Sequence, residues 1–282
     1  MVPAELDALL AFVLGACCGS FVGLIAYRLP RGISIVTPRS FCAACHRPLP
    51  GWANVPLVSY LLLRGRCGAC RAPIGFRAFL IELTLATIAL YLYLHFPLPD
   101  AIARLVFCAL LLVVGLIDFD WRVMPDVWPL IPLAMLAAWW ILPEVGWRDS
   151  ALGLVVGGGL PIAVAAAYKL LRRETGLAAA DISLAALSGA FLGWFGALFT
   201  ICGGALIGVI GGLALALDGW RPAEQHLPQP VAEAYAPEGL DLARESRRPL
   251  MRTAVPFAPF LALAAGVYAL FQPQLVQWYF GG

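Results

Sequence analysis

Long apolar segments with few charges recur along this 282-residue chain and constrain its fold more than any other feature. They predict helices at about residues 6–27, 78–96, 101–118, 127–142, 150–171, 180–196, 198–217 and 255–274. Each is close to the roughly 20 residues with which an α-helix crosses a hydrocarbon core about 30 Å thick. We therefore predict an all-α polytopic membrane protein with about eight transmembrane helices.

The composition leaves no room for a soluble domain of ordinary size. Hydrophobic residues make up 61% of the chain and charged residues 13%, whereas about a quarter of the residues in soluble domains are charged. We expect three parts: a first transmembrane helix at 1–27, a polar loop at 28–77, and a helical bundle at 78–282 that contains a further polar loop at about 218–253. Membrane lipid is the expected surrounding, and no nucleic-acid partner is expected.

The distribution of basic residues predicts the orientation. With eight spans, every lysine and arginine among the 19 in the chain, except Arg104 and Arg148, falls on the side of the loop at 28–77. Basic residues mark the cytosolic side of membrane proteins. We therefore expect both polar loops, and the breaks near Asp118 and Asp181, to face the cytosol.

The first polar loop carries two CxxC motifs, formed by Cys42 with Cys45 and by Cys67 with Cys70. Their separation of about 20 residues is typical of a zinc ribbon, in which each motif presents two sulfurs to one tetrahedral ion. Two disulfides are the alternative, but thiols stay reduced in the cytosol. We predict a structural zinc site, because four thiolates leave no open position for catalysis. His46 is expected to be a surface residue.

Two aspartates lie at the edges of apolar segments on the predicted cytosolic side. Asp118 ends one segment, and Asp181 opens a later one. Two carboxyls at close range cannot both ionise, so one is left as a base and the other as an acid. Such a pair can hydrolyse an amide: the base takes a proton from water and the acid donates a hydrogen bond to the scissile carbonyl, without a metal or a covalent intermediate.

The residues alone leave a second interpretation open, in which Asp118 and Asp181 only mark helix ends near water and Asp181 caps its own helix. Asp120 and Asp126 are weaker candidates, because Asp126 stands at a helix start, where capping is the usual role. Glu82 lies inside the second apolar segment near its cytosolic end. It either faces the active region, which we favour, or reaches toward water.

Taken together, several motifs resemble the type IV prepilin leader peptidases, bifunctional membrane enzymes of bacterial pilus and type II secretion systems. The resemblance covers nearly the whole chain. Its segments are Gly19-Ser20-Phe21 with Tyr27-Arg28-Leu29-Pro30 in the first helix, Pro38 to Cys70 in the cysteine loop, Ile117-Asp118 with Pro125-Asp126, Ala180-Asp181 with Leu184 and Gly189, and Pro256 to Ala264 in the last helix.

The resemblance implies an enzyme of the bacterial inner membrane with Asp118 and Asp181 as its catalytic residues. It implies cleavage of the basic leader of prepilins or pseudopilins on the cytosolic side, after a glycine and before a residue that is usually phenylalanine. It also implies N-methylation of the new amino terminus with S-adenosylmethionine. The residues independently support only the cleavage; no cofactor-binding fingerprint is present, so the cofactor-binding residues are unknown.

The chain departs from the family pattern near its second aspartate and in two other places. The family has Gly-x-Gly-Asp where this chain has Ala178-Ala179-Ala180-Asp181, and it usually has lysine at Ser183. Compared with glycine, alanine favours the helical backbone by roughly 1 kcal/mol per position, so the backbone beside the carboxylate is less free to extend. Gly23 and Ala53 replace the usual asparagine and aspartate. Two alternatives therefore stay open: a catalytically impaired relative that binds prepilins or assists assembly, and a methyltransferase without protease activity.

Overall fold

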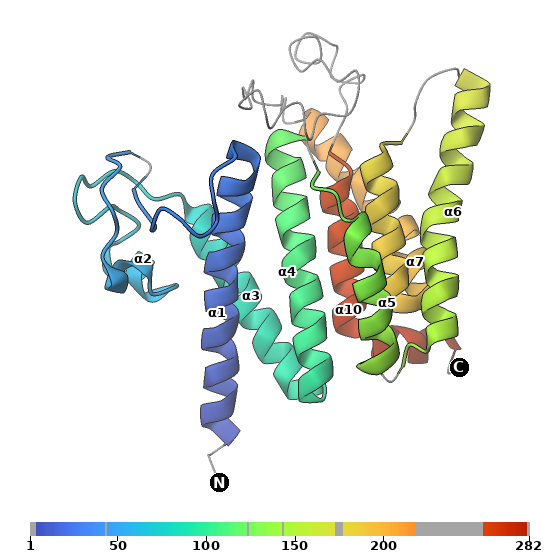
Figure 1. Cartoon of the computed structure of the whole chain (residues 1–282), viewed down its shortest axis with the longest axis horizontal. Helices are drawn as coiled ribbons and strands as arrows, with labels where there is room; N and C mark the ends of the chain where they lie inside the picture. The colour runs from blue at the N-terminus through green and yellow to red at the C-terminus, as the bar shows by residue number, and fades with distance from the viewer. Residues whose placement is uncertain are drawn as a thin grey trace. The chain divides into compact units, whose positions relative to one another are not determined.

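The computed structural model describes residues 4–42, 44–122, 124–142, 144–172, 177–217 and 256–280. These residues form helices, with two isolated β-bridges and no longer strand, which confirms the predicted all-α class (Figure 1). The chain divides into two compact units, Met1–Val113 and Val114–Gly282. The loop predicted at about 218–253 lies outside the described residues.

Six helices in the described part of the chain are long and apolar enough to cross a membrane. They are α1 (Ala4–Arg28), α3 (Phe76–His95), α4 (Leu98–Trp121), α6 (Trp147–Arg172), α7 (Ala179–Leu217) and α10 (Ala258–Phe280). A shorter apolar helix at Trp128–Trp140 combines the turn η3 (Trp128–Leu130) with α5 (Ile131–Trp140). The cysteine loop contains η1 (Leu29–Arg31), η2 (Gly51–Asn54) and α2 (Val58–Leu62).

Helix α7 contains two of the predicted spans. Gly193 has φ 81° and ψ 179°, a conformation that is essentially restricted to glycine. A Cβ on Gly189 would lie 3.0 Å from the Cβ of Ala197, although eight residues of straight helix would separate these positions by about 12 Å. The chain therefore turns at Gly193, close to the predicted boundary at 196–198. With the two halves of α7 and the short α5, the eight predicted apolar segments are all present.

In unit 1, α1 packs closely on α3 through glycines. A Cβ on Gly15 would lie 2.5 Å from the carbonyl oxygen of Leu85, and one on Gly19 would lie 2.6 Å from the Cα of Glu82. Such small residues let membrane helices approach closely, so that packing can hold them together. This contact fixes where the cysteine loop leaves α1 and enters α3.

Arg104 lies inside unit 1. Its side chain is fully buried, its Nε donates to Asp100 Oδ1 at 2.6 Å, and its guanidinium lies 4.4 Å from the centre of the Phe96 ring. A buried charge is tolerated when it is paired in this way. The ion pair therefore explains how α4 carries an arginine within an apolar span.

In unit 2, α6 packs on the first half of α7, again through glycines. A Cβ on Gly153 would overlap the carbonyl oxygen of Gly189, and one on Gly157 would overlap that of Ala185. Spaced four residues apart, Gly153 and Gly157 form the small-xxx-small pattern of closely packed membrane helices. The glycine run at 157–159 thus serves packing at Gly157, whereas a Cβ on Gly159 would meet nothing within 4 Å.

We expect Gly153→Ala to lower the free energy of unfolding by about 1–3 kcal/mol, because the added methyl group forces the two backbones apart. Gly159→Ala is the matched control on the same helix. It should leave stability unchanged or raise it by up to about 1 kcal/mol, because alanine favours helix. Unfolding of the purified variants by titration with sodium dodecyl sulfate measures both. Equal stabilities would contradict the packing described above.

Candidate aspartyl site and metal centre

The two predicted aspartates come to the same end of unit 2. Asp118 lies in the last turn of α4, and Asp181 lies in the first turn of α7. Both side chains are partly buried. The two carboxyl groups are close enough for their charges to interact. The fold thus brings together two acidic groups that are far apart in the sequence.

Two helix N-termini face these carboxyl groups. The backbone N–H of Ala258, the first residue of α10, donates a hydrogen bond to Asp118, and that of Ala178, just before α7, donates one to Asp181. Arg122 also interacts electrostatically with Asp118. Helix N-termini carry partial positive charge and stabilise anions. A negative charge shared by the pair is therefore stabilised, while the contact from Ala178 is also the capping contact expected of Asp181.

One oxygen of the pair has no partner. Oδ2 of Asp118 is buried, and it forms no hydrogen bond within the described part of the chain. A buried acceptor left in this way costs about 1–3 kcal/mol. A proton held by the second carboxyl, or a donor group of a substrate, would remove that cost. The arrangement can therefore support acid–base chemistry at Asp118.

Of the two alanines that replace the family glycines, Ala180 lies in α7 and Ala178 directly precedes it. The N–H of Asp181 donates to the carbonyl of Ala178 at 3.1 Å, and the hydroxyl of Ser183 donates to the carbonyl of Ala180 at 2.7 Å. Alanine favours helix, whereas glycine leaves the backbone free to extend. The backbone is consequently helical from Ala179 onward, through Asp181.

Two other predicted carboxylates make structural contacts. Asp126 is exposed, and its Oδ1 accepts a hydrogen bond from the N–H of Trp128 at 3.0 Å, as expected for a residue at a helix start. In unit 1, Glu82 Oε2 accepts one from the N–H of Leu57 at 2.7 Å. Glu82 therefore fixes the beginning of α2 to α3, a contact that neither interpretation of this residue anticipated.

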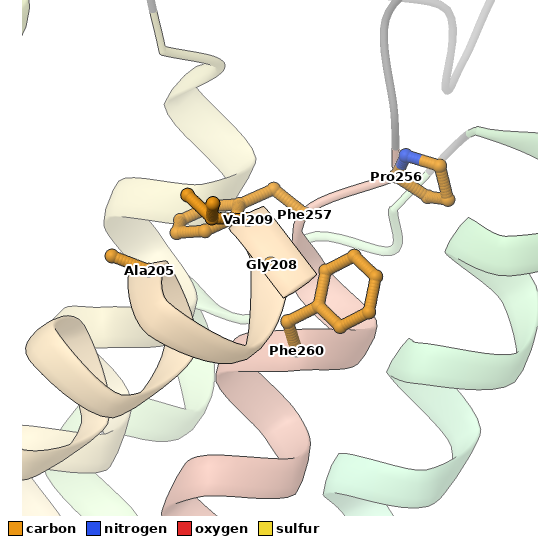
Figure 2. A pocket seen from close by; sticks show the side chains of 6 residues that line it. All are labelled: Ala205, Gly208, Val209, Pro256, Phe257 and Phe260. Atoms are coloured by element: carbon orange, nitrogen blue, oxygen red, sulfur yellow. The ribbon is translucent and has the colours of Figure 1, made fainter. Parts of the chain in front are cut away.

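An apolar cleft of about 260 Å³ lies between the second half of α7 and the start of α10 (Figure 2). Pro256 and Phe257, which line it, directly precede Ala258, the residue that donates to Asp118. Small-molecule sites typically span about 300–1,000 Å³, so the cleft is large enough for an apolar side chain. Its lining residues are Ala205, Gly208, Val209, Pro256, Phe257 and Phe260.

The four loop cysteines form one cluster of free thiols, the arrangement that a metal site requires. Their sulfur atoms all lie within 4.8 Å of one another, and the sulfurs of Cys42 and Cys70 are 3.8 Å apart. A tetrahedral ion with metal–sulfur bonds of about 2.3 Å requires sulfur–sulfur distances of about 3.8 Å. The donor set therefore fits such an ion. His46 is exposed and stacks on Phe41, outside the cluster.

The two CxxC motifs fold alike, a repeat that the sequence analysis missed. In each motif the N–H of the first cysteine donates to the carbonyl five residues later, at 3.0 Å from Cys42 and at 2.8 Å from Cys67. The residue after the second cysteine has a positive φ in both, 56° at His46 and 60° at Arg71. The shared pattern Cys-x-x-Cys-x-x-Pro was the available signal.

Backbone amides prepare Cys67 for a metal. The N–H groups of Cys70 and Ala69 lower the pKa of the Cys67 thiol to about 6, and the Ala69 nitrogen lies 3.4 Å from the sulfur. The thiolate is the form that binds metal ions. This cysteine is therefore ready to act as a ligand at neutral pH.

Comparison with known proteins identifies the family of this chain. Residues 13–96 match the bacterial peptidase A24 N-terminal domain, and residues 105–213 match the type IV leader peptidase family. Prepilin leader peptidase/N-methyltransferases of Myxococcus xanthus and Pseudomonas aeruginosa are 31% and 30% identical to it, over 96% of this chain and 92% of each relative. No solved structure matches the chain. By these similarities, the chain belongs to the type IV leader peptidase family.

Proposed function

We propose that this chain is a membrane aspartic endopeptidase that removes the basic leader peptide of type IV prepilins or pseudopilins. The observation that supports it most is the interaction between the carboxyl groups of Asp118 and Asp181 at one end of unit 2. The names of its relatives supply the substrate class.

In the proposed reaction, the ionised carboxyl takes a proton from a water molecule, whose oxygen forms a bond to the scissile carbonyl carbon. The protonated carboxyl donates a hydrogen bond to the carbonyl oxygen. The carbon–nitrogen bond then breaks, and the leaving amine takes a proton from the dyad. The N–H groups of Ala258 and Ala178 hold the shared charge throughout. Whichever of Asp118 and Asp181 is ionised acts as the base, and the protonated one acts as the acid.

The proposal places the aspartates at the cytosolic face of the bacterial inner membrane, because nearly all basic residues fall on that side of the spans. A membrane site there meets a substrate whose basic leader stays in the cytosol and whose apolar helix lies in the bilayer. In this layout, residues 1–27 form the first span, residues 28–77 the cytosolic loop and residues 78–282 the catalytic bundle. Zinc held by the four cysteines would organise the loop without taking part in hydrolysis.

Methylation of the new amino terminus is a further proposed activity, supported by the relatives' name. The residues that would hold S-adenosylmethionine are not identified, and no step is derived through that cofactor. A second candidate is an impaired relative that binds prepilins without cutting them, since Ala180, which replaces a family glycine, is helical.

The direct test is coexpression of a prepilin with this protein, followed by mass measurement of the pilin. Loss of the leader is expected, and an additional 14 Da or so would report a single methyl group, by the mass of the group transferred. A substrate that stays whole, while the protein is folded in the membrane, would favour the binding factor.

We expect the cleft to receive the apolar residue next to the cleaved bond, because Phe257 in its lining directly precedes Ala258, which donates to Asp118. Ala205→Phe would fill it and should lower cleavage about tenfold, mainly through KM, because the residue lost from the cleft is worth about 1–3 kcal/mol. Leu206→Phe, on an exposed neighbour outside the cleft, is the control. Cleavage rates at several prepilin concentrations distinguish them, and identical KM values would exclude the cleft as a subsite.

A further inference from the structure

The short helix α2 exposes an apolar face within unit 1. On the opposite side, Tyr60 packs on α3, with its ring centre 5.2 Å from that of Phe79 and 6.3 Å from that of Phe76. The exposed apolar side chains all lie within residues 52–62. They are Trp52 (56%), Val55 (45%), Val58 (51%), Leu61 (64%) and Leu62 (72%).

Two contacts fix the level of α2 along the membrane helices. Leu57, the residue before α2, donates its N–H to Glu82, and Glu82 is in close contact with Gly19 of α1. Gly19 lies nine residues before Arg28, the end of α1, a distance of about 14 Å at 1.5 Å per residue. α2 therefore begins beside α1 and well short of its end, as Figure 1 also shows.

The beginning of the loop lies at a different level. The guanidinium of Arg28 donates to the carbonyl of Ser34 at 2.8 Å, and the N–H of Val36 donates to the hydroxyl of Ser34 at 3.2 Å. Val36 is thus held near the end of α1, and 79% of it is exposed. The loop leaves the end of α1 and then returns alongside the membrane helices.

This return brings α2 to the depth of lipid. The 25 residues of α1 are about 38 Å long, whereas a hydrocarbon core is about 30 Å thick. With α1 centred in the bilayer, a level about 14 Å from its end lies roughly 10 Å inside the core boundary, the depth reached by interfacial helices. Water cannot cover the apolar face of α2 at that level.

The charge of the loop fits an anionic membrane surface. Residues 28–77 contain no aspartate or glutamate. Arg64, Arg66 and Arg71, which follow α2, are all exposed. Each basic residue near an anionic bilayer surface contributes about 1 kcal/mol of attraction. The loop contains eight arginines: Arg28, Arg31, Arg39, Arg47, Arg64, Arg66, Arg71 and Arg77.

We propose that α2, together with Trp52 and Val55, is an interfacial anchor that inserts into the lipid leaflet at the Arg28 end of α1, with the following arginines bound to anionic phospholipid headgroups. The cysteine loop is then attached to the bilayer as well as to its two flanking helices. This inference goes beyond the proposed peptidase activity and does not depend on it.

The test places one fluorescent non-natural amino acid at Leu62 or at Val36 of the full chain, which leaves every cysteine in place. The two positions are both apolar and similarly exposed, and they differ in level. The protein is reconstituted in vesicles of phosphatidylethanolamine and phosphatidylglycerol. Quenching is measured with lipids that carry a quencher on the acyl chain and with iodide in the buffer. The zinc content of both variants confirms that the loop is folded.

We expect the acyl-chain quencher to act several-fold more strongly at position 62 than at position 36, and iodide to show the opposite preference. Replacing phosphatidylglycerol with phosphatidylcholine should weaken lipid quenching at position 62. The proposal is overturned if both positions respond alike to iodide. It is also overturned if neither reagent reaches position 62, since a protein partner would then cover α2.

Discussion

Asp118→Asn and Asp181→Asn should each lower prepilin cleavage by about 100- to 10,000-fold, the range by which a positioned acid or base accelerates a reaction. Asparagine keeps the shape of the side chain but can neither accept the proton of water nor supply one. Because the two groups act as a unit, the double variant should be no slower than the slower single variant. Cleavage is measured as the fraction of prepilin that has lost its leader.

The matched control for these variants is Asp126→Asn. Asp126 lies in the same sequence segment, but it is exposed and bonds to the N–H of Trp128. Its replacement should leave cleavage near the wild-type rate and change stability by about 1 kcal/mol or less, as for other helix-start contacts. If the Asp118→Asn and Asp181→Asn variants both still cleave prepilin, Asp118 and Asp181 are not the catalytic pair.

Cys67→Ser should reduce the metal content of the purified protein from about one zinc ion per chain to nearly none, since a four-thiolate site loses a ligand that serine does not replace. A structural zinc site contributes about 10–16 kcal/mol of binding free energy in small domains, so the loop should become sensitive to protease. Cleavage of prepilin should fall much less, because the metal takes no part in the chemistry. Elemental analysis and limited proteolysis measure these effects.

Cys18→Ser is the control for the metal prediction. Cys18 is an exposed free thiol on α1 that does not belong to the cluster, so zinc and loop stability should stay unchanged. A wild-type protein that carries no metal when purified without chelators would count against the metal centre. So would a Cys67→Ser protein that keeps its full zinc content.

The sequence was most informative where chemistry depends on residue type and spacing. Apolar segments predicted the helices, the two CxxC motifs predicted the sulfur cluster, and the aspartates at segment ends predicted two carboxyls that interact. Each of these follows from a local pattern. The boundary between the predicted spans at 180–196 and 198–217 was nevertheless placed only approximately, because the helical pattern continues across Gly193 and the turn depends on one backbone conformation.

Features made by contacts between distant segments could not be predicted. The cleft is formed by α7 residues whose pattern is that of an ordinary small-residue helix, by Phe257 just before α10 and by Phe260 within it. The contact of Glu82 with Leu57 depends on the loop returning along α3. No period or motif encodes such a return, since it is set by packing and by the backbone geometry of a few loop residues.

The reversal of the chain at Gly193 has a consequence for how this protein can evolve or be altered. In an uninterrupted helix Asp181 and Gly208 would be about 40 Å apart, whereas here one adjoins Asp118 and the other lines the cleft next to it. Any residue with a side chain at position 193 would oppose the positive φ of 81°. The conformation of Gly193 therefore allows one continuous apolar segment both to bring Asp181 to Asp118 and to line the cleft with Gly208.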